Sequence, residues 1–179
     1  VRVLLEIVLK FIELNHDLAN HDSLKQILKL LNHKSIYLRM DALKVVVEFG
    51  KINSDLLNSD TFNAVASLLD PASKDDNLID AAMKTVDALL ELNNGLATTD
   101  NLSKVMQMLL FSPVHQANSM SLRHTVVNGI NNLITTNEDL PTVSNFFDAL
   151  SLLENTQNTE REFVLKIIYY SHFEKMNYD

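Results

Sequence analysis

The sequence predicts an all-α fold in which helical hairpins stack into a right-handed superhelical solenoid. A ten-residue phrase that begins with asparagine occurs four times, at residues 15, 53, 93 and 137, so its spacing is 38, 40 and 44 residues. One amphipathic helical frame follows each phrase, and a second helical frame comes next. Because a single helical hairpin cannot bury both of its faces, a chain that repeats the hairpin at this period is expected to stack one unit on the next.

The composition agrees with a folded helical protein and argues against several other classes. The 179 residues are 46% hydrophobic, enough to bury a core, and their mean hydropathy is +0.01. Three glycines and three prolines are too few for the many tight turns of an all-β chain. The formal net charge of -8 argues against non-specific binding to nucleic acid. The absence of cysteine excludes a disulfide framework, a zinc ribbon and a thiol nucleophile.

The first predicted element is an amphipathic helix over residues 1–14. Its charged residues recur every three or four positions and so share one face, which argues against a membrane span. They are Arg2, Glu6, Lys10 and Glu13, and the apolar face carries Leu4, Leu5, Val8, Phe11 and Ile12. No earlier helix covers the far side of this half unit, so either further repeats precede it or it serves as a cap. Because the periodic pattern is already under way at Val1, we expect a fragment of a longer protein.

The repeated phrase is predicted to be a rigid connector between hairpins. The step from a second-helix anchor to the next first-helix anchor is 20 residues in every unit (4 to 24, 42 to 62, 82 to 102, 126 to 146), whereas the step within a hairpin varies from 18 to 24. We expect a recurrent leucine to enter the core, a recurrent asparagine to close the preceding helix in a left-handed turn, and a recurrent polar residue to cap the next helix. The leucines are Leu18, Leu56, Leu96 and Leu140, the asparagines are Asn15, Asn53, Asn93 and Asn137, and the predicted caps are Asp22, Asp60, Asp100 and Ser144.

Four hairpins are expected after the half unit, all in one domain over residues 1–179. Their first helices contain the anchors at 24, 62, 102 and 146, and their second helices those at 42, 82, 126 and 164. The units are a half repeat at 1–21 and repeats at 22–59, 60–99, 100–143 and 144–179. The longer loops, at 70–77 and 111–121, leave the same edge of the stack and form a candidate binding edge, unless they reflect neutral length drift.

A period of 38–44 residues with two helices and a short connector resembles the armadillo and HEAT repeat families over essentially the whole chain. The HEAT-like feature is an arginine three places before the small anchor of the second helix, at Arg39, Arg123 and Arg161, with Ile79 in the second unit. The armadillo-like feature is the helix ending NGINNLI at 128–134. The chain lies between the two families and is closer to armadillo.

The resemblance implies a binding groove along the second helices, where peptide-binding armadillo proteins carry a ladder of tryptophan and asparagine. The tryptophan positions fall on Glu6, Lys44, Lys84, Asn128 and Lys166, and the asparagine positions on Glu48, Ala88, Asn132 and Tyr170. Only Asn132 keeps the ladder residue, so recognition of basic peptides is not expected. The candidate partner-binding residues are Lys44, Glu48, Lys84, Asn128, Asn132, Lys166 and Tyr170. Their three lysines would form a basic track for an acidic peptide or loop, unless they are ordinary solvated lysines.

The sequence contains no pattern typical of a catalytic or metal site. Its six histidines lack the i,i+4 spacing of helical metal ligands, and it has no phosphate-binding glycine motif and no GxSxG. We expect no catalytic residue, metal or cofactor. We predict a non-catalytic scaffold or adaptor, cytoplasmic or nuclear, which binds a protein or extended peptide through its groove or loop edge, without nucleic acid and without membrane insertion. The alternative is a chaperone cofactor, because small four-repeat armadillo proteins include exchange factors that clamp an Hsp70 nucleotide domain.

Overall fold

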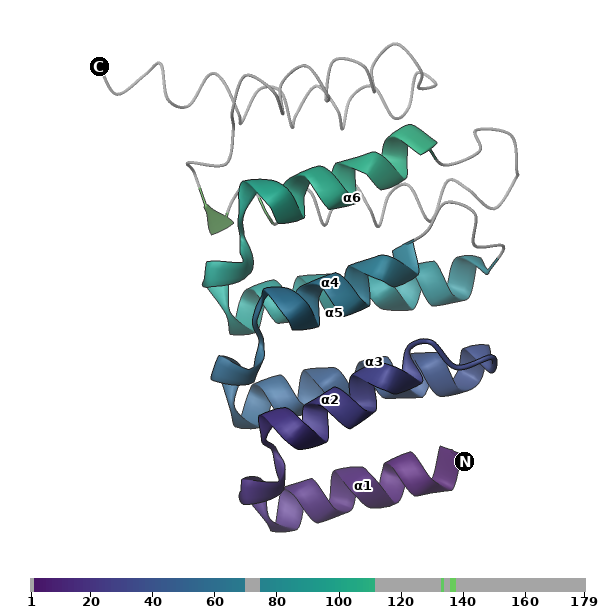
Figure 1. The fold of residues 1–179 in the computed structure, drawn as a ribbon, viewed down its shortest axis with the longest axis vertical. Helices are drawn as coiled ribbons and strands as arrows, with labels where there is room; N and C mark the ends of the chain where they lie inside the picture. The colour runs from purple at the N-terminus through teal and green to yellow at the C-terminus, as the bar shows by residue number, and fades with distance from the viewer. Residues whose placement is uncertain (1, 70–74, 112–132, 134–135, 138–179) are drawn as a thin grey trace. The chain divides into compact units, whose positions relative to one another are not determined.

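The computed structural model describes residues 2–69, 75–111, 133, 136 and 137, which form helices joined by short connectors (Figure 1). No β-strand occurs in this part of the chain, so the predicted all-α fold is confirmed for it. The chain divides into two compact units, one of residues 1–69 and 77–96 and the other of residues 70–76 and 97–179. The superhelical solenoid remains a prediction.

The first unit is made of paired helices joined by one-turn 3-10 helices. The α-helices are α1 (Arg2–Leu14), α2 (His21–Leu30), α3 (Ile36–Ile52), α4 (Ser59–Ala66) and α5 (Asp76–Leu92), and the 3-10 helices are η1 (His16–Leu18), η2 (Ser54–Leu56), η3 (Ser67–Leu69) and η4 (Asn94–Leu96). In Figure 1, α2 lies in front of α3, and α4 lies in front of α5. α3 packs against both α1 and α2.

The described part of the second unit contains α6 (Thr99–Phe111) and, further along the chain, Leu133, Thr136 and Asn137. Leu133 and Thr136 are helical, and the backbone N–H of Asn137 donates to the Leu133 carbonyl over 3.2 Å. The predicted repeat at 144–179 lies wholly outside the described residues.

The repeated phrase folds into the same short turn at its three fully described copies. The asparagine side chain accepts a hydrogen bond from the backbone N–H two residues later, which starts a 3-10 turn. The pairs are Asn15 with Asp17 (3.1 Å), Asn53 with Asp55 (3.1 Å), and Asn93 with Gly95 (3.0 Å). The predicted recurrence of one connector structure is therefore confirmed for these copies.

The backbone of these asparagines differs from the prediction of a left-handed turn, which was wrong. Asn15 has φ −141° and ψ 96°, and Asn53 has φ −147° and ψ 99°, so both are extended. No described non-glycine residue has a positive φ. The 3-10 turn explains the difference, because each asparagine serves as its N-terminal cap, and a capping residue is extended so that its side chain can reach back to the turn.

Two connectors are also tied to the connector before them. The Asn93 side-chain amide donates to the Leu57 carbonyl over 2.6 Å in the first unit. In the second unit the equivalent Asn137 amide donates to the Ala97 carbonyl over 2.8 Å. The donor is the first residue of its phrase and the acceptor is the fifth residue of the preceding phrase, so the two bonds are the same contact repeated.

The caps of the first helices lie two residues earlier than predicted. The cap and the N–H that it accepts are Asn20 with Ser23 (3.0 Å), Asn58 with Thr61 (3.1 Å), and Thr98 with Asn101 (3.3 Å). Asp22, Asp60 and Asp100, which we predicted as caps, lie instead in the first turn of α2, α4 and α6. There the carboxylates interact favourably with the positive end of the helix dipole without capping the helix. The predicted cap Ser144 lies outside the described residues.

The pattern of burial recurs together with the connectors. Residues 41–50 of α3 and 81–90 of α5 have the same order of buried, half-buried and exposed positions. Each stretch buries large apolar side chains almost completely, among them Leu43, Val46 and Phe49 in α3, and Met83, Val86 and Leu89 in α5. The 40-residue step that the sequence predicts between these two helices therefore also relates their buried faces.

The connector leucines behave as predicted in two copies and not in the first. Leu56 is 1% exposed and Leu96 is 3% exposed, whereas Leu18 is 39% exposed, so the prediction for Leu18 was wrong. Leu18 belongs to the first connector, and no earlier connector lies against it within the described residues. Leu140 is outside the described residues. The connector after α3 also approaches that helix closely, because a Cβ at Gly50 would lie 2.5 Å from Leu57 Cδ1.

Candidate partner-binding surface

The structure describes three of the seven residues predicted to bind a partner. Lys44 and Glu48 lie on α3, and Lys84 lies on α5. The other four, which are Asn128, Asn132, Lys166 and Tyr170, lie outside the described residues. Of the two candidate edge loops, at 70–77 and 111–121, only residues 75–77 and Phe111 are described. The surface can therefore be built from the outward faces of α3 and α5.

Lys44 and Lys84, here called the lysine row, hold the same place in the two helices. Each is the one exposed residue in its ten-residue stretch, 41–50 or 81–90. Their side chains are 64% and 70% exposed. Because the residues on either side of each lysine are buried, neither helix can rotate without exposing its core, and the two positive charges stay outward.

Each lysine of the row is already paired with a carboxylate on its own helix. Lys44 Nζ lies 3.0 Å from Asp41 Oδ1, and Lys84 Nζ lies 2.7 Å from Asp80 Oδ2. The side chains of Asp41 and Asp80 are only 14% and 33% exposed, so each ammonium covers a less accessible carboxylate. The sequence prediction did not include these acidic partners, although their spacing of three and four residues on a helix is a recognisable signal. The row is therefore outwardly basic but locally close to neutral.

Glu48, the third described candidate, belongs to a different ion pair. Its Oε1 accepts from Lys51 Nζ over 2.6 Å. The equivalent positions of α1, 38 residues earlier, carry the reversed pair Lys10 and Glu13, whose Nζ–Oε2 distance is 2.8 Å. The hydrogen bond that Lys10 donates to Glu13, together with the charge of that carboxylate, raises the pKa of Lys10. The Glu48 carboxylate is therefore held in an ion pair on its own helix, as the Lys44 and Lys84 ammonium groups are.

The lysine row does not extend to α1. The equivalent position there is Glu6, which is exposed. Within the first unit, the basic part of the predicted groove therefore consists of Lys44 and Lys84 only. An acidic ligand would be attracted at α3 and α5 and repelled at α1.

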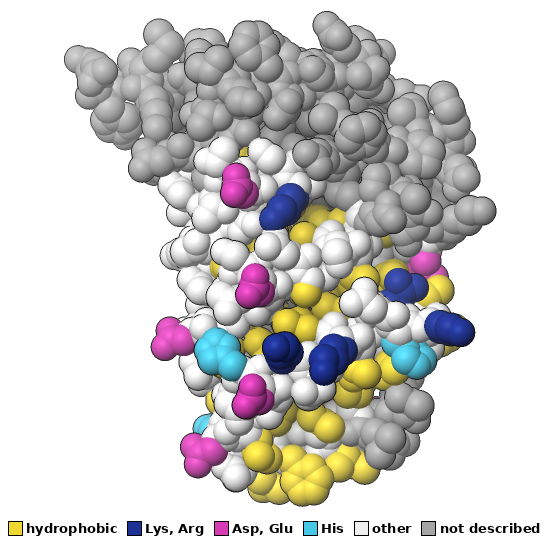
Figure 2. Space-filling model, in the orientation of Figure 1, with side chains coloured by type: hydrophobic (Ala, Val, Ile, Leu, Met, Phe, Trp, Pro, Cys, Tyr) yellow, Lys and Arg dark blue, Asp and Glu magenta, His cyan; other side chains and the backbone are white. Residues whose placement is uncertain are grey.

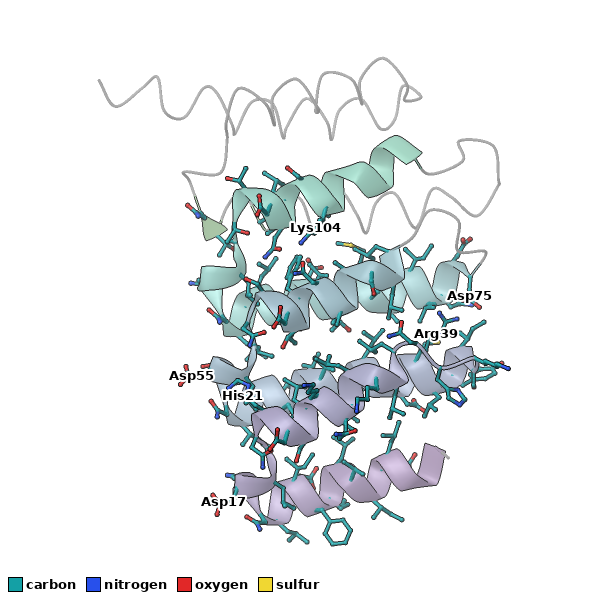
Figure 3. All side chains as sticks on the ribbon, viewed as in Figure 1. Asp17, His21, Arg39, Asp55, Asp75 and Lys104 are labelled. Atoms are coloured by element: carbon teal, nitrogen blue, oxygen red, sulfur yellow. The ribbon has the colours of Figure 1, made fainter. Side chains whose placement is uncertain are left out.

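The edge that carries the connectors has the opposite charge. Asp17 and Asp55 occupy equivalent places in η1 and η2 and point away from the helices (Figure 3). Asp22 and Asp60, in the first turns of the next helices, are exposed as well. Figure 2 shows most of the acidic side chains in view, in magenta, toward the left of the molecule. Within the described residues, the connector edge therefore carries exposed aspartates, whereas the outward faces of α3 and α5 carry the lysine row.

The described residues contain neither a metal-binding cluster nor a membrane-spanning helix. No three histidine, aspartate or glutamate side chains among them are close enough to hold a metal ion. No helix in this part of the chain has both the length and the apolar character needed to cross a bilayer. His16, His21 and His33 are exposed, and His33 Nδ1 accepts from the Ser35 N–H over 3.0 Å.

The lysine row is the recurrent exposed feature of α3 and α5. The chain matches no protein-family model, no curated protein and no solved structure.

Proposed function

We propose that the chain is a non-catalytic protein-interaction scaffold of armadillo/HEAT type that binds an acidic, extended segment of a partner protein along its second helices. The observation that carries the proposal is the lysine row, in which one exposed lysine recurs at the same place in α3 and α5. A surface position that recurs in step with a buried frame presents its side chain at a regular interval. Regular intervals are what an extended ligand can follow.

The interval defines the ligand. Neighbouring helices in a stack are separated by about 10 Å. An extended peptide in the polyproline II conformation has three residues per turn and advances by about 3.1 Å per residue, so acidic residues at every third position would lie on one side and meet successive lysines. The binding mode is a side-chain ladder that reads charge and spacing.

The strength of such a contact follows from its exposure. An exposed ion pair contributes only about 0–1 kcal/mol, whether the lysine pairs with its own aspartate or with a ligand carboxylate. Replacement of the lysine's own aspartate by a ligand carboxylate therefore costs little free energy, and each such contact adds little to the binding free energy. We expect modest affinity, fast association and a strong dependence on ionic strength.

The test uses the full chain and a fluorescein-labelled peptide with glutamate at every third position. A peptide with glutamine in place of glutamate is the matched ligand control. Fluorescence anisotropy should detect binding of the acidic peptide alone, and that binding should weaken as salt rises. The double variant Lys44→Glu/Lys84→Glu should weaken binding by about tenfold or more, at roughly 0.7 kcal/mol for each lost exposed contact.

A second double variant separates the lysine row from net charge. Lys25→Glu/Lys29→Glu changes the charge equally on the exposed face of α2. It should leave binding within about twofold of the parent, and circular dichroism should show full helix content in both variants. Equal weakening by the two variants, or no weakening by the first, would remove the lysine row as the binding site and direct attention to the loop edge.

A further inference from the structure

A contiguous apolar face is exposed on α1 and its connector. Four large hydrophobic side chains are exposed there: Ile7 (43%), Phe11 (58%), Leu14 (84%) and Leu18 (39%). The three on α1 are spaced by four and three residues, so they share one side of the helix. Figure 2 shows hydrophobic side chains gathered at this end of the molecule, over α1. Folded proteins seldom leave such a face open unless something binds to it.

Three of the four equivalent positions are buried in the next helix of this type and its connector, and the fourth, Ile52, is half-buried. A shift of 38 residues converts the α1 face into Val45, Phe49, Ile52 and Leu56. Val45 is 0% exposed, while Phe49 and Leu56 are each 1% exposed. In α5 and η4 the corresponding Thr85, Leu89 and Leu96 are buried too, at 5%, 0% and 3%. Exposure at these positions is therefore peculiar to α1 among the three.

The neighbours of each helix explain the difference. α3 packs against α1, the earlier helix of its own type, and against α2, its hairpin partner. α1 packs against the later helix α3, and within the described residues it has neither an earlier helix nor a hairpin partner ahead of it. The positions that are open only in α1 are consequently those that face toward preceding helices.

The residue types on this face are those of an interior helix. Isoleucine corresponds to valine, phenylalanine to phenylalanine, leucine to isoleucine, and leucine to leucine. A terminal helix that caps a repeat array instead carries polar residues on its outer face, because that face meets water. α1 therefore lacks the composition of a cap, which was one of the two alternatives left open by the sequence.

We infer that the α1 face is a stacking surface for a helix pair of the same kind as α1 and α2. The occupant is defined by the packing of α3, whose equivalent face is filled by such a pair. It presents aliphatic side chains equivalent to those on the opposite side of α1, where Leu5 and Ile12 are buried at 6% and 3%. This inference concerns the end of the stack and does not depend on the lysine row.

The test extends the chain by one period. A copy of residues 2–39 placed directly ahead of Arg2 continues the repeat in register, because residue 40 is 38 residues after residue 2. The protein has no tryptophan, so Phe11→Trp in the original α1 gives a single fluorescent reporter. In the 179-residue chain its emission should be that of an exposed indole. In the extended chain the emission should shift to shorter wavelength, and quenching by acrylamide should fall several-fold.

Phe49→Trp is the matched control, since it occupies the equivalent covered position and should emit as a buried indole in both chains. A second readout is the urea midpoint of Phe11→Ser, which should stay near that of the parent in the 179-residue chain and fall clearly in the extended chain. A reporter that stays exposed after extension, or an added copy that gains no helix, would overturn the inference. So would sedimentation showing that the 179-residue chain forms a dimer abolished by Phe11→Ser, because a second copy would then be the occupant.

Discussion

The paired connector leucines allow a direct test of how the core is built. Leu56 and Leu18 hold the same place in successive connectors, yet they are 1% and 39% exposed. Truncation of each to alanine removes the equivalent of about three CH2 groups, worth roughly 2.4 kcal/mol when fully buried. The Leu18 side chain is only about three-fifths buried, and water can fill the space that its truncation leaves. Leu18→Ala should therefore lower the free energy of unfolding by about 1.4 kcal/mol. At Leu56 a cavity remains, and Leu56→Ala should cost about 3–4 kcal/mol.

Urea unfolding followed by circular dichroism measures the difference. With an m-value of about 2 kcal/mol/M, the midpoint should fall by about 1.5–2 M for Leu56→Ala and by about 0.7 M for Leu18→Ala. The m-value should be the same in both variants, which establishes that stability and not the unfolded state has changed. Equal shifts for the two leucines would refute the assignment of Leu56 to the core and of Leu18 to an uncovered end.

Two further predictions concern the connectors. Asn93→Ala removes both the turn hydrogen bond and the hydrogen bond to the Leu57 carbonyl, whereas Asn53→Ala removes a turn hydrogen bond alone within the described residues. Asn93→Ala should therefore lower the free energy of unfolding in urea by about 1 kcal/mol more than Asn53→Ala. Equal losses would mean that the hydrogen bond between connectors contributes nothing to stability. Asn58→Ala should lower the free energy of unfolding by about 1 kcal/mol, because it removes the cap of α4. Asp60→Asn should lower it by no more than about 0.3–1 kcal/mol at low salt, because it removes only an interaction with the helix dipole. If Asp60→Asn lowered the thermal stability more than Asn58→Ala, Asp60 would be the cap.

The helices and the recurrence of the connector were predictable because they depend on the spacing of apolar residues. That spacing constrains a helix face strongly, and the 40-residue step between α3 and α5 predicts their shared burial pattern. The outward position of Lys44 and Lys84 follows from the same frame. Their aspartate partners could have been identified as well, since Asp41 and Asp80 precede them by three and four residues.

The errors have local causes that periodicity does not report. Asn20 and Asp22 are both good capping residues two positions apart, and only the exact start of α2 decides between them. Asparagine tolerates both a left-handed and an extended backbone, and the 3-10 turn after Asn15 selects the extended one. Leu18 has the sequence of a buried connector residue, but its burial depends on a neighbour that residue spacing alone cannot supply.

The hydrogen bond between neighbouring connectors requires a particular side chain at only one of the two residues that it joins. An asparagine amide donates, but the acceptor is a main-chain carbonyl, which every residue possesses. The accepting position is accordingly leucine in one copy, Leu57, and alanine in the other, Ala97. If a hairpin were duplicated, deleted or exchanged with another, this hydrogen bond could therefore form again without a requirement on the side chain at the accepting position.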